Sequence, residues 1–426
     1  MSIKEMLFES KKASFQMAGL GTEIKNQILL RFAELIELKK HFLLEQNALD
    51  MTEQKNKIAA PLYQRLKLDE NKLRDLATGI RGMVQLEDPV GIEEKCVLLD
   101  EGLQLKKISV PLGVLGIIFE SRPDVIPQIL SLVLKSGNVA VLKGGTEALN
   151  SNRAFMSLVG QLNQEFPQLP IRWAQLVETR EEISELLKYP EYVDLVIPRG
   201  SNQLVQHIMK NTQIPVLGHA DGICHVFMDE SFNQEIALDV IIDSKAQYPS
   251  ACNAMETLLV HSQIAKTWIP KIMDRAKSEG IEIFACERSR QIAPELTAVD
   301  DWGIEYGDLK FSLKIVNSIN EAIEHINIFG SHHTDCILSD IPDHQKLFCQ
   351  LVDSACVFIN CSTRFADGFR FGMGAEVGIS TAKTHARGPV GLDGLVIYKY
   401  QLTGKGQTVA MYSGPNAKSF VHKVIS

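Results

Sequence analysis

The sequence predicts an α/β protein with parallel β-sheets that helices cover on both faces. Three observations support this fold class. From Gly113 onward, short apolar runs of strand length alternate with longer amphipathic runs of helix length. Strands joined by helices of that length run parallel through right-handed crossovers. The chain also has 426 residues, which exceeds one ordinary hydrophobic core and implies two or three domains.

The N-terminal half divides into a helical part, a hairpin and an alternating part. Residues 1–90 have the apolar spacing of helices, and 97–110 favour a protruding β-hairpin around the turn at 100–102. After Gly113, strands are expected at 114–119, 139–142, 172–177, 193–197 and 216–217, and helices at 125–135, 149–164, 181–188 and 202–210. The ligands of such sheets bind at the carboxyl ends of the strands.

A second alternating set follows in the C-terminal half. Helices are expected at 235–246, 264–277, 321–326 and 345–351, and strands at 257–260, 281–285, 336–338 and 357–360. The chain closes with two β-like arms, 395–402 and 407–412, around a glycine-containing turn at 404–406.

Composition narrows the function classes. Hydrophobic residues make up 45% of the chain and charged residues 23%, with a net charge of −8. This balance is typical of a soluble globular enzyme and disfavours nucleic acid and anionic membranes as partners. Because no apolar run approaches about 18 residues, we expect no membrane span and a cytoplasmic location.

The cysteines indicate neither a metal site nor a disulfide framework. The chain has eight of them, none in a C-x-x-C pair and none at a spacing typical of zinc ligands. Nothing in the sequence points to export, so we expect reduced thiols.

Cys252 is the candidate nucleophile. It lies in the loop QYPSACNA (247–254), between the helix expected at 235–246 and the buried strand at 257–260. A loop held between two packed elements is a rigid mount for a reactive group, and a thiolate attacks carbonyl carbon well. The alternative is a buried cysteine that acts as a small hydrophobic residue.

Two expected strands are each followed by a short segment that contains glycine and a basic residue, which we call a strand exit. One exit is Lys143-Gly144-Gly145, and the other is Arg199-Gly200-Ser201, which opens a helix. Exposed N–H groups at a helix start suit an anionic phosphate, and a nearby cation strengthens the site. The alternative is ordinary turn chemistry, and no G-x-G-x-x-G fingerprint is present.

A second glycine-rich region, 358–392, contains several cationic residues. Arg364, Arg370, His385 and Arg387 lie there among six glycines. Glycines allow the backbone to approach a ligand closely, and arginines bind carboxylate or phosphate. The alternative is a loop-rich surface with solvated arginines.

Six segments of the chain share one resemblance: 110–124 (VPLGVLGIIFESRPD), 134–152, 193–202, 223–231, 247–261 and 362–392. They resemble the gamma-glutamyl phosphate reductase family of the aldehyde dehydrogenase superfamily, and the likeness extends from the N-terminal helices to about Gln407. Tyr248 stands where family members commonly have arginine, whereas the pair Cys252-Asn253 is intact.

The resemblance implies an aldehyde dehydrogenase-like fold in three parts. These are a Rossmann-like cofactor domain (1–230) that carries the hairpin, an α/β catalytic domain (231–394) and a C-terminal β arm for oligomerisation (395–426). It implies NADPH-dependent reduction of L-glutamate 5-phosphate to L-glutamate 5-semialdehyde and phosphate, the second step of proline biosynthesis from glutamate. A homo-oligomer is implied as well, and the glutamate 5-kinase that makes the acyl phosphate is a candidate partner.

The resemblance also assigns roles to residues. Cys252 would form a thioester, with Asn253 beside it. The cofactor would contact the two strand exits together with Thr146 and Glu305, the latter at the position that holds the nicotinamide ribose. Thr146 is small and neutral where the superfamily often has glutamate, which favours NADPH over NADH. The substrate would contact Ser121, Arg122, Arg364 and Arg387; a structural salt bridge is the alternative for each arginine.

Three other functions are compatible with the sequence. The first alternative is a hydrolytic dehydrogenase for another aldehyde. Such enzymes activate water with a glutamate, and the comparable segment 217–222 has no glutamate. His219 or Asp221 could serve as the base instead. The second is an inactive scaffold, which the intact Cys252 and both strand exits argue against. The third is a cysteine acyltransferase that uses no nucleotide.

Overall fold

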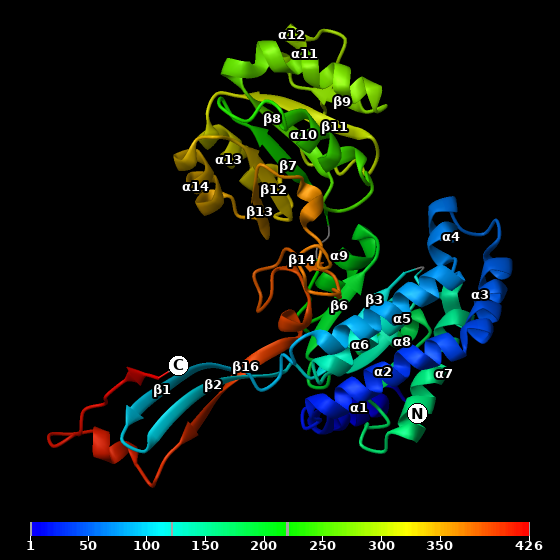
Figure 1. Ribbon diagram of the computed structural model, residues 1–426, viewed down its shortest axis with the longest axis vertical. Coiled ribbons are helices and arrows are strands. Elements are labelled where there is room, and N and C mark those ends of the chain that lie inside the picture. The colour runs from blue at the N-terminus through cyan, green and yellow to red at the C-terminus, as the bar shows by residue number, and fades with distance from the viewer. Residues whose placement is uncertain (1, 121, 219–220, 426) are drawn as a thin grey trace.

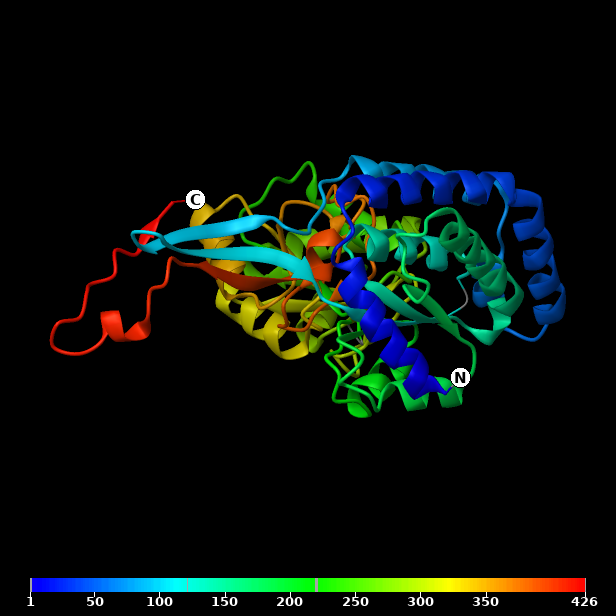
Figure 2. The same cartoon turned by 90° about the horizontal axis from the view of Figure 1, so that it is seen from below.

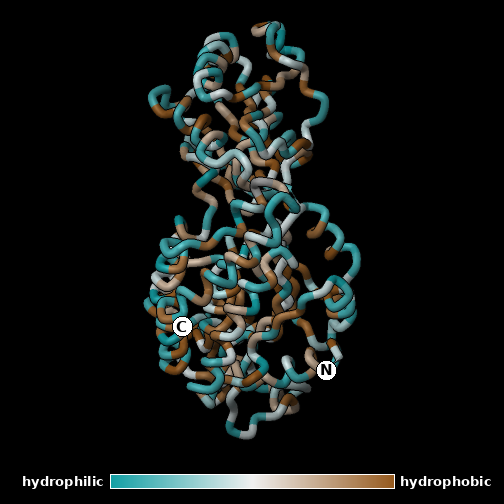
Figure 3. Tube along the Cα trace, turned by 90° about the vertical axis from the view of Figure 1, so that its right-hand side faces the viewer, coloured by the Kyte–Doolittle hydropathy of each residue, from teal (hydrophilic) through white to brown (hydrophobic). Residues whose placement is uncertain are grey.

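Two parallel sheets and one antiparallel ribbon organise the chain, which confirms the predicted α/β class. The computed structural model describes residues 2–120, 122–218 and 221–425. Each parallel sheet has its own layers of helices, and the two resulting lobes meet at a narrow waist (Figure 1, Figure 3). The ribbon projects sideways from the lower lobe of Figure 1.

The first sheet has four parallel strands in the order β5-β4-β3-β6. Its strands are β3 (Val114–Phe119), β4 (Val139–Lys143), β5 (Ala174–Val177) and β6 (Leu195–Arg199), and its helices are α6 (Val125–Lys135), α7 (Leu149–Glu165), α8 (Arg180–Leu186) and α9 (Asn202–Lys210). Every residue of β3 is buried, as in a strand covered on both faces. The strand order reverses between β3 and β6, and ligands of open α/β sheets bind at such a point.

One expected strand of this region does not form. Residues 216–217 make only an isolated bridge, between Val216 and Val196. Pro215 precedes them and has no N–H group to donate to a neighbouring strand, which limits pairing there.

Five helices precede the ribbon, which confirms the helical pattern predicted for residues 1–90. They are α1 (Ile3–Met17), α2 (Thr22–Leu38), α3 (Lys40–Gln54), α4 (Ala60–Leu66) and α5 (Glu70–Gln85). Helices α1, α2, α3 and α5 share one hydrophobic core with β3, β4 and β6, whereas α4 packs on α3. The dark blue helices of Figure 2 lie along this lobe.

The second sheet has seven parallel strands in the order β10-β9-β11-β8-β7-β12-β13. They are β7 (Cys224–Met228), β8 (Met255–His261), β9 (Glu282–Ala285), β10 (Thr297–Ala298), β11 (Lys310–Val316), β12 (Thr334–Leu338) and β13 (Cys356–Ile359). The helices are α10 (Ala237–Ala246), α11 (Ser262–Ser278), α12 (Glu287–Ile292), α13 (Ile319–Phe329) and α14 (Pro342–Leu351). The sequence did not predict β7 and β11, although both lie next to β8 at the centre.

The chain returns from the second lobe to the first before it ends. The short strands β14 (Ile379–Ser380) and β15 (Gly388–Pro389) pair with each other, and Val377, Val390 and Leu395 belong to the first hydrophobic core. The lobes are thus joined by two crossings of the chain.

The ribbon contains β1 (Glu93–Asp100), β2 (Leu103–Pro111), β16 (Val396–Thr403) and β17 (Lys423–Val424) in the order β16-β2-β1-β17. The hairpin and the arm at 395–402 are confirmed, but the strand expected at 407–412 is wrong. Residues Val409–Tyr412 form a 3-10 turn, in which the Tyr412 hydroxyl donates to Asp100 at 2.8 Å, and β17 pairs with β1 instead.

No helix among the described residues is both long enough and apolar enough to cross a bilayer.

A buried carboxylate joins the N-terminal helices to the first sheet. Asp50, on α3 and 1% exposed, accepts hydrogen bonds from the backbone N–H groups of Asn150 and Ser151 and from the Ser151 hydroxyl, at 2.6–2.9 Å. It thereby caps the start of α7, which follows the Lys143-Gly144-Gly145 exit.

We expect Asp50→Ala to lower the free energy of unfolding by about 2–4 kcal/mol, because it leaves three donors without their acceptor. Urea denaturation followed by tryptophan fluorescence measures the change. Glu9→Ala is the control, since Glu9 pairs with Lys12 at the surface and its loss should cost less than about 1 kcal/mol. Equal effects of the two substitutions would contradict the capping role.

Candidate active site

A cavity of about 1190 Å³ runs along the carboxyl edge of the first sheet and reaches the loop that carries Cys252. The predicted residues that line it are Lys143, Gly145, Thr146, Arg199, Gly200, Ser201, Glu305, Arg122 and Cys252. Gly144, Asn253, Arg364 and Arg387 lie outside its lining, and Ser121 lies outside the described residues. The structure therefore brings the nucleophile and both strand exits to one cavity.

One end of the cavity is cationic. Lys143, at the end of β4, lies near Arg180, the first residue of α8. Burial lowers the pKa of Lys143, Glu147 opposes that shift, and the positive charge of Arg180 adds to it. A partly buried lysine whose charge is disfavoured in this way is stabilised by an anionic ligand.

The glycines after Lys143 permit close packing at this end. A Cβ atom on Gly144 would overlap the side chain of Asn152 and lie 3.0 Å from the ring of Phe119, and one on Gly145 would overlap the carboxylate of Glu147. Gly145 faces the cavity, whereas Gly144 serves the packing behind it.

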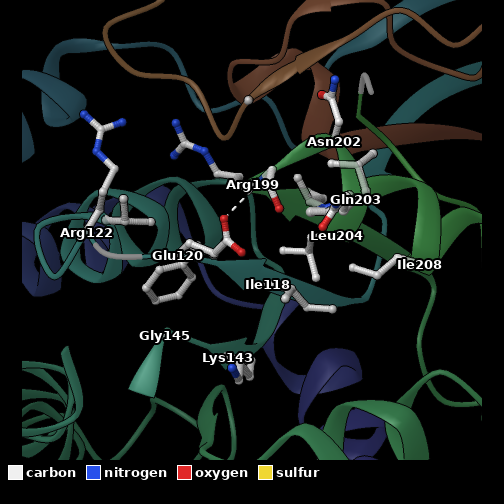
Figure 4. A pocket seen from close by; sticks show the side chains of 18 of the residues that line it. Ile118, Glu120, Arg122, Lys143, Gly145, Arg199, Asn202, Gln203, Leu204 and Ile208 are labelled. Carbon is white, nitrogen blue, oxygen red and sulfur yellow. Dashed lines mark hydrogen bonds between the residues drawn. The ribbon is translucent and has the colours of Figure 1, made fainter. Parts of the chain in front are cut away.

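The exit of β6 differs from the expectation of an open phosphate site. The backbone N–H of Ser201, where α9 begins, donates to Glu120 Oε2 at 2.9 Å (Figure 4). The same oxygen would lie 2.6 Å from a Cβ on Gly200. A carboxylate of the protein itself therefore occupies the start of α9, and an anionic ligand that bound there would displace it.

Arg199 and Arg122 form a cationic pair at the next part of the cavity. Figure 4 shows their guanidinium groups on the same side, far from Lys143. Burial lowers the pKa of Arg199, and the charge of Arg122 lowers it further. Nη1 of Arg199 is buried and makes no hydrogen bond among the described residues. Such a pair has unused donors for an anion.

Cys252 lies in the loop between α10 and β8, at the amino edge of the second sheet. Of the eight cysteines, all of them free, Cys252 alone lines the cavity. The Cys224 thiol donates to the Cys252 carbonyl at 3.3 Å, and a Cβ on Gly222 would overlap that same carbonyl oxygen. The backbone that leads into β7 thus supports the nucleophile directly.

The remaining predicted residues hold loops together. Asn253 Nδ2 donates to the carbonyl of Ala366 at 2.8 Å, which ties the nucleophile loop to the returning chain. Arg364 Nε donates to Gln247 Oε1 at 2.9 Å, at the start of the same loop.

Arg387 pairs with Asp353 at 3.0 Å and donates to the Thr381 carbonyl. It thus forms the structural salt bridge that was the alternative to substrate binding. Arg122 is thus the one predicted substrate arginine that lines the cavity.

The structure adds cavity residues that the sequence reasoning missed. Arg180 had a signal, since it follows the exit of β5 as Lys143 and Arg199 follow theirs. Arg65, Glu120 and Glu376 also line the cavity, but no spacing pattern distinguishes them.

Comparisons with known proteins agree along the whole chain. The sequence profile of the aldehyde dehydrogenase family matches residues 1–282. The gamma-glutamyl phosphate reductase of Acetivibrio thermocellus is 49% identical over 424 residues, which cover 99% of this chain and 98% of that protein. The protein of the same name from Nostoc sp. is 51% identical over 425 residues, with the same two coverages of 99% and 98%.

Solved structures give the same picture. The crystal structure of gamma-glutamyl phosphate reductase from Thermotoga maritima superimposes with a TM-score of 0.93 at 37% identity, over 96% of this chain and 100% of that one. A glyceraldehyde-3-phosphate dehydrogenase from Methanocaldococcus jannaschii, solved with NADP, has a TM-score of 0.67 at 14% identity, over 95% and 94%, which shows the fold alone. Aldehyde dehydrogenases use nicotinamide cofactors. The chain therefore belongs to the aldehyde dehydrogenase family and, within it, to the gamma-glutamyl phosphate reductases.

Proposed function

We propose that this oxidoreductase reduces L-glutamate 5-phosphate to L-glutamate 5-semialdehyde and phosphate with NADPH, as the second step of proline biosynthesis from glutamate. One observation carries the proposal: the cysteine in the nucleophile loop and the cationic end at Lys143 belong to the same cavity. The relatives are gamma-glutamyl phosphate reductases, and this activity supplies the proposed substrate.

The residues present fit a dinucleotide phosphate. A cavity of about 1190 Å³ is large enough for one, and the partly buried Lys143 with Arg180 supplies positive charge for a 2′-phosphate. Thr146 is small and neutral, Ser201 lies at the start of α9, and Glu305 would hold the nicotinamide ribose. When bound, NADPH supplies the hydride that reduces an acyl group to an aldehyde.

Cys252 would accept the acyl group from the substrate. Its Sγ forms a bond to the acyl carbon while the C–O bond to phosphate breaks, and phosphate leaves with the electron pair. The N–H groups of Ala251 and Ala254 are bonded within the loop, so the amide of Cys252 itself is the candidate donor to the oxyanion. Asn253 would keep this loop in place through its bond to Ala366.

Arg122 and Arg199 are the proposed anion clamp for the substrate. Both line the cavity together with Cys252, and Nη1 of Arg199 has no partner among the described residues. Arg199, which the sequence assigned to the cofactor, would thus serve the acyl phosphate instead. Arg364 would act by holding the nucleophile loop, and Arg387 through its pairing with Asp353.

Two proposals concern the surroundings of the enzyme in the cell. The ribbon exposes Tyr398, Tyr400 and Leu402, of which Tyr400 is 62% exposed, and a second copy of the chain would cover such a surface. The acyl phosphate is labile and must reach the reductase before it decays. The enzyme would therefore work in the cytoplasm, where it can encounter the glutamate 5-kinase that makes this substrate.

The reverse reaction tests the proposed function. Purified protein with pyrroline-5-carboxylate, NADP⁺ and inorganic phosphate should produce NADPH, measured by its absorbance, and Cys252→Ala should abolish production. Reduction without phosphate would establish a hydrolytic dehydrogenase, for which Glu120 and Glu376 are cavity carboxylates. No reduction, with no rise in melting temperature on adding NADPH, would favour the scaffold.

Arg180 tests the cofactor preference. Because a charge-assisted contact is worth about 1.5–3 kcal/mol, Arg180→Ala should raise KM for NADPH by about 10- to 100-fold and leave KM for NADH within about twofold. The control is Arg153→Ala, since Arg153 forms a surface pair with Glu178. Similar kcat/KM values for NADPH and NADH in the unchanged protein would argue against the preference itself.

Gly222 tests the backbone support of the nucleophile. Gly222→Ala should lower kcat by more than about tenfold, because the new Cβ would displace the Cys252 carbonyl. Gly160→Ala is the matched control: Gly160 lies inside α7 with open space around its Cα, so the change should preserve activity. Wild-type kcat in Gly222→Ala would contradict this support.

A further inference from the structure

A buried ion pair brackets the nucleophile loop. Lys245, in the last turn of α10, and Glu256, the second residue of β8, are both 0% exposed, and Lys245 Nζ lies 2.8 Å from Glu256 Oε2. The loop 247–254 that carries Cys252 lies between them in the sequence. The pair therefore fixes the two ends of this loop relative to each other.

Glu256 also holds a second segment of the site. Its Oε2 accepts the N–H of Tyr306 at 3.2 Å, and its Oε1 accepts the N–H of Gly307 at 3.4 Å. The residue immediately before them is Glu305, which lines the cavity. The Tyr306 ring also stacks on Phe284, with 5.2 Å between centroids. The turn is thus held at its backbone by Glu256 and at its side chain by this ring.

Stability alone is a poor reason for this pair. Burial raises the pKa of Glu256 to about 7 and lowers the pKa of Lys245, although each charge favours the other. Replacing a buried ion pair with apolar residues of similar volume is often neutral or stabilising. Glu256 makes directed contacts to two separate segments, the end of α10 and the turn at 306–307, and an apolar pair could not make them.

We propose that Lys245 and Glu256 are positioning residues that fix Cys252 and Glu305 relative to each other across the cavity. The proposal rests on the proposed function, because it takes Glu305 as the residue that holds the cofactor. The same carboxylate that closes the nucleophile loop also anchors the turn behind Glu305. A shift of either segment is thereby coupled to the other.

The main test is the apolar double variant Lys245→Met/Glu256→Leu, which fills the volume without charge or directed bonds. The variant frees the N–H groups of Tyr306 and Gly307, but this turn is partly exposed and water can bond them, so we expect a melting temperature within a few degrees of the wild type. The Kd for NADPH, measured by its fluorescence, should rise about tenfold, and iodoacetamide should alkylate Cys252 at a changed rate. Lys25→Met/Asp88→Leu is the control, because Lys25 and Asp88 form a largely buried pair at 3.0 Å, 1% and 10% exposed, and line no part of the cavity.

A double-mutant cycle shows whether the pair acts through Glu305. In a Glu305→Gln background the double variant should change the Kd for NADPH by less than about twofold, since the residue that it positions is already altered. An undiminished tenfold change there would overturn action through Glu305.

The remaining outcomes separate this proposal from the proposed function. Unchanged NADPH affinity together with an unchanged alkylation rate in the double variant would reduce the pair to a structural role. Wild-type protein that does not bind NADPH would overturn the proposed function and the Glu305 part of the proposal. The alkylation rate would then decide the Cys252 part alone.

Discussion

The site depends on one geometric constraint: the carboxyl edge of the first parallel sheet faces the amino edge of the second. Lys143 and Arg199 end strands of the first sheet, whereas Cys252 precedes a strand of the second, and all three line one cavity. The chain crosses between the lobes twice, and at one crossing Gly222 lies directly against the Cys252 backbone. The nucleophile is thereby positioned by the connection itself and not only by its own loop.

Charges of both signs line the cavity, with five lysine or arginine side chains and four glutamates among the described residues. The net charge of the chain is −8, yet Lys143, Arg180, Arg199 and Arg122 all line the same space. The cations stand in two groups, Lys143 with Arg180 and Arg199 with Arg122, and each group could bind one of the two proposed ligands, which are both anions. Glu120 offsets part of this charge at the start of α9. An anionic ligand that binds at the start of α9 would therefore replace the Glu120 carboxylate.

The sequence predicted what local patterns encode and missed what depends on distant partners. Buried apolar runs predicted β3 and β4, and basic residues after strands predicted the cavity edge, because both signals lie within a few residues. β7 was not predicted, because the polar residue His225 interrupts its apolar run. The structure shows that Asp335 makes a hydrogen bond of 2.9 Å to this side chain, which allows it to be buried. Likewise, Arg387 resembled a ligand residue until its pairing with Asp353 was visible.

The ribbon has a consequence for how the chain is made. β2 pairs along its length with β16, which leaves the ribosome roughly 280 residues later, about 15–60 s at usual synthesis rates. During that interval the hairpin has an open edge, to which other chains could add. Lys106 and Lys107 lie on β2 and pair with Glu93 and Glu94 of the hairpin itself. Charge on an open edge discourages aggregation, and Lys106 and Lys107 place charge on this edge.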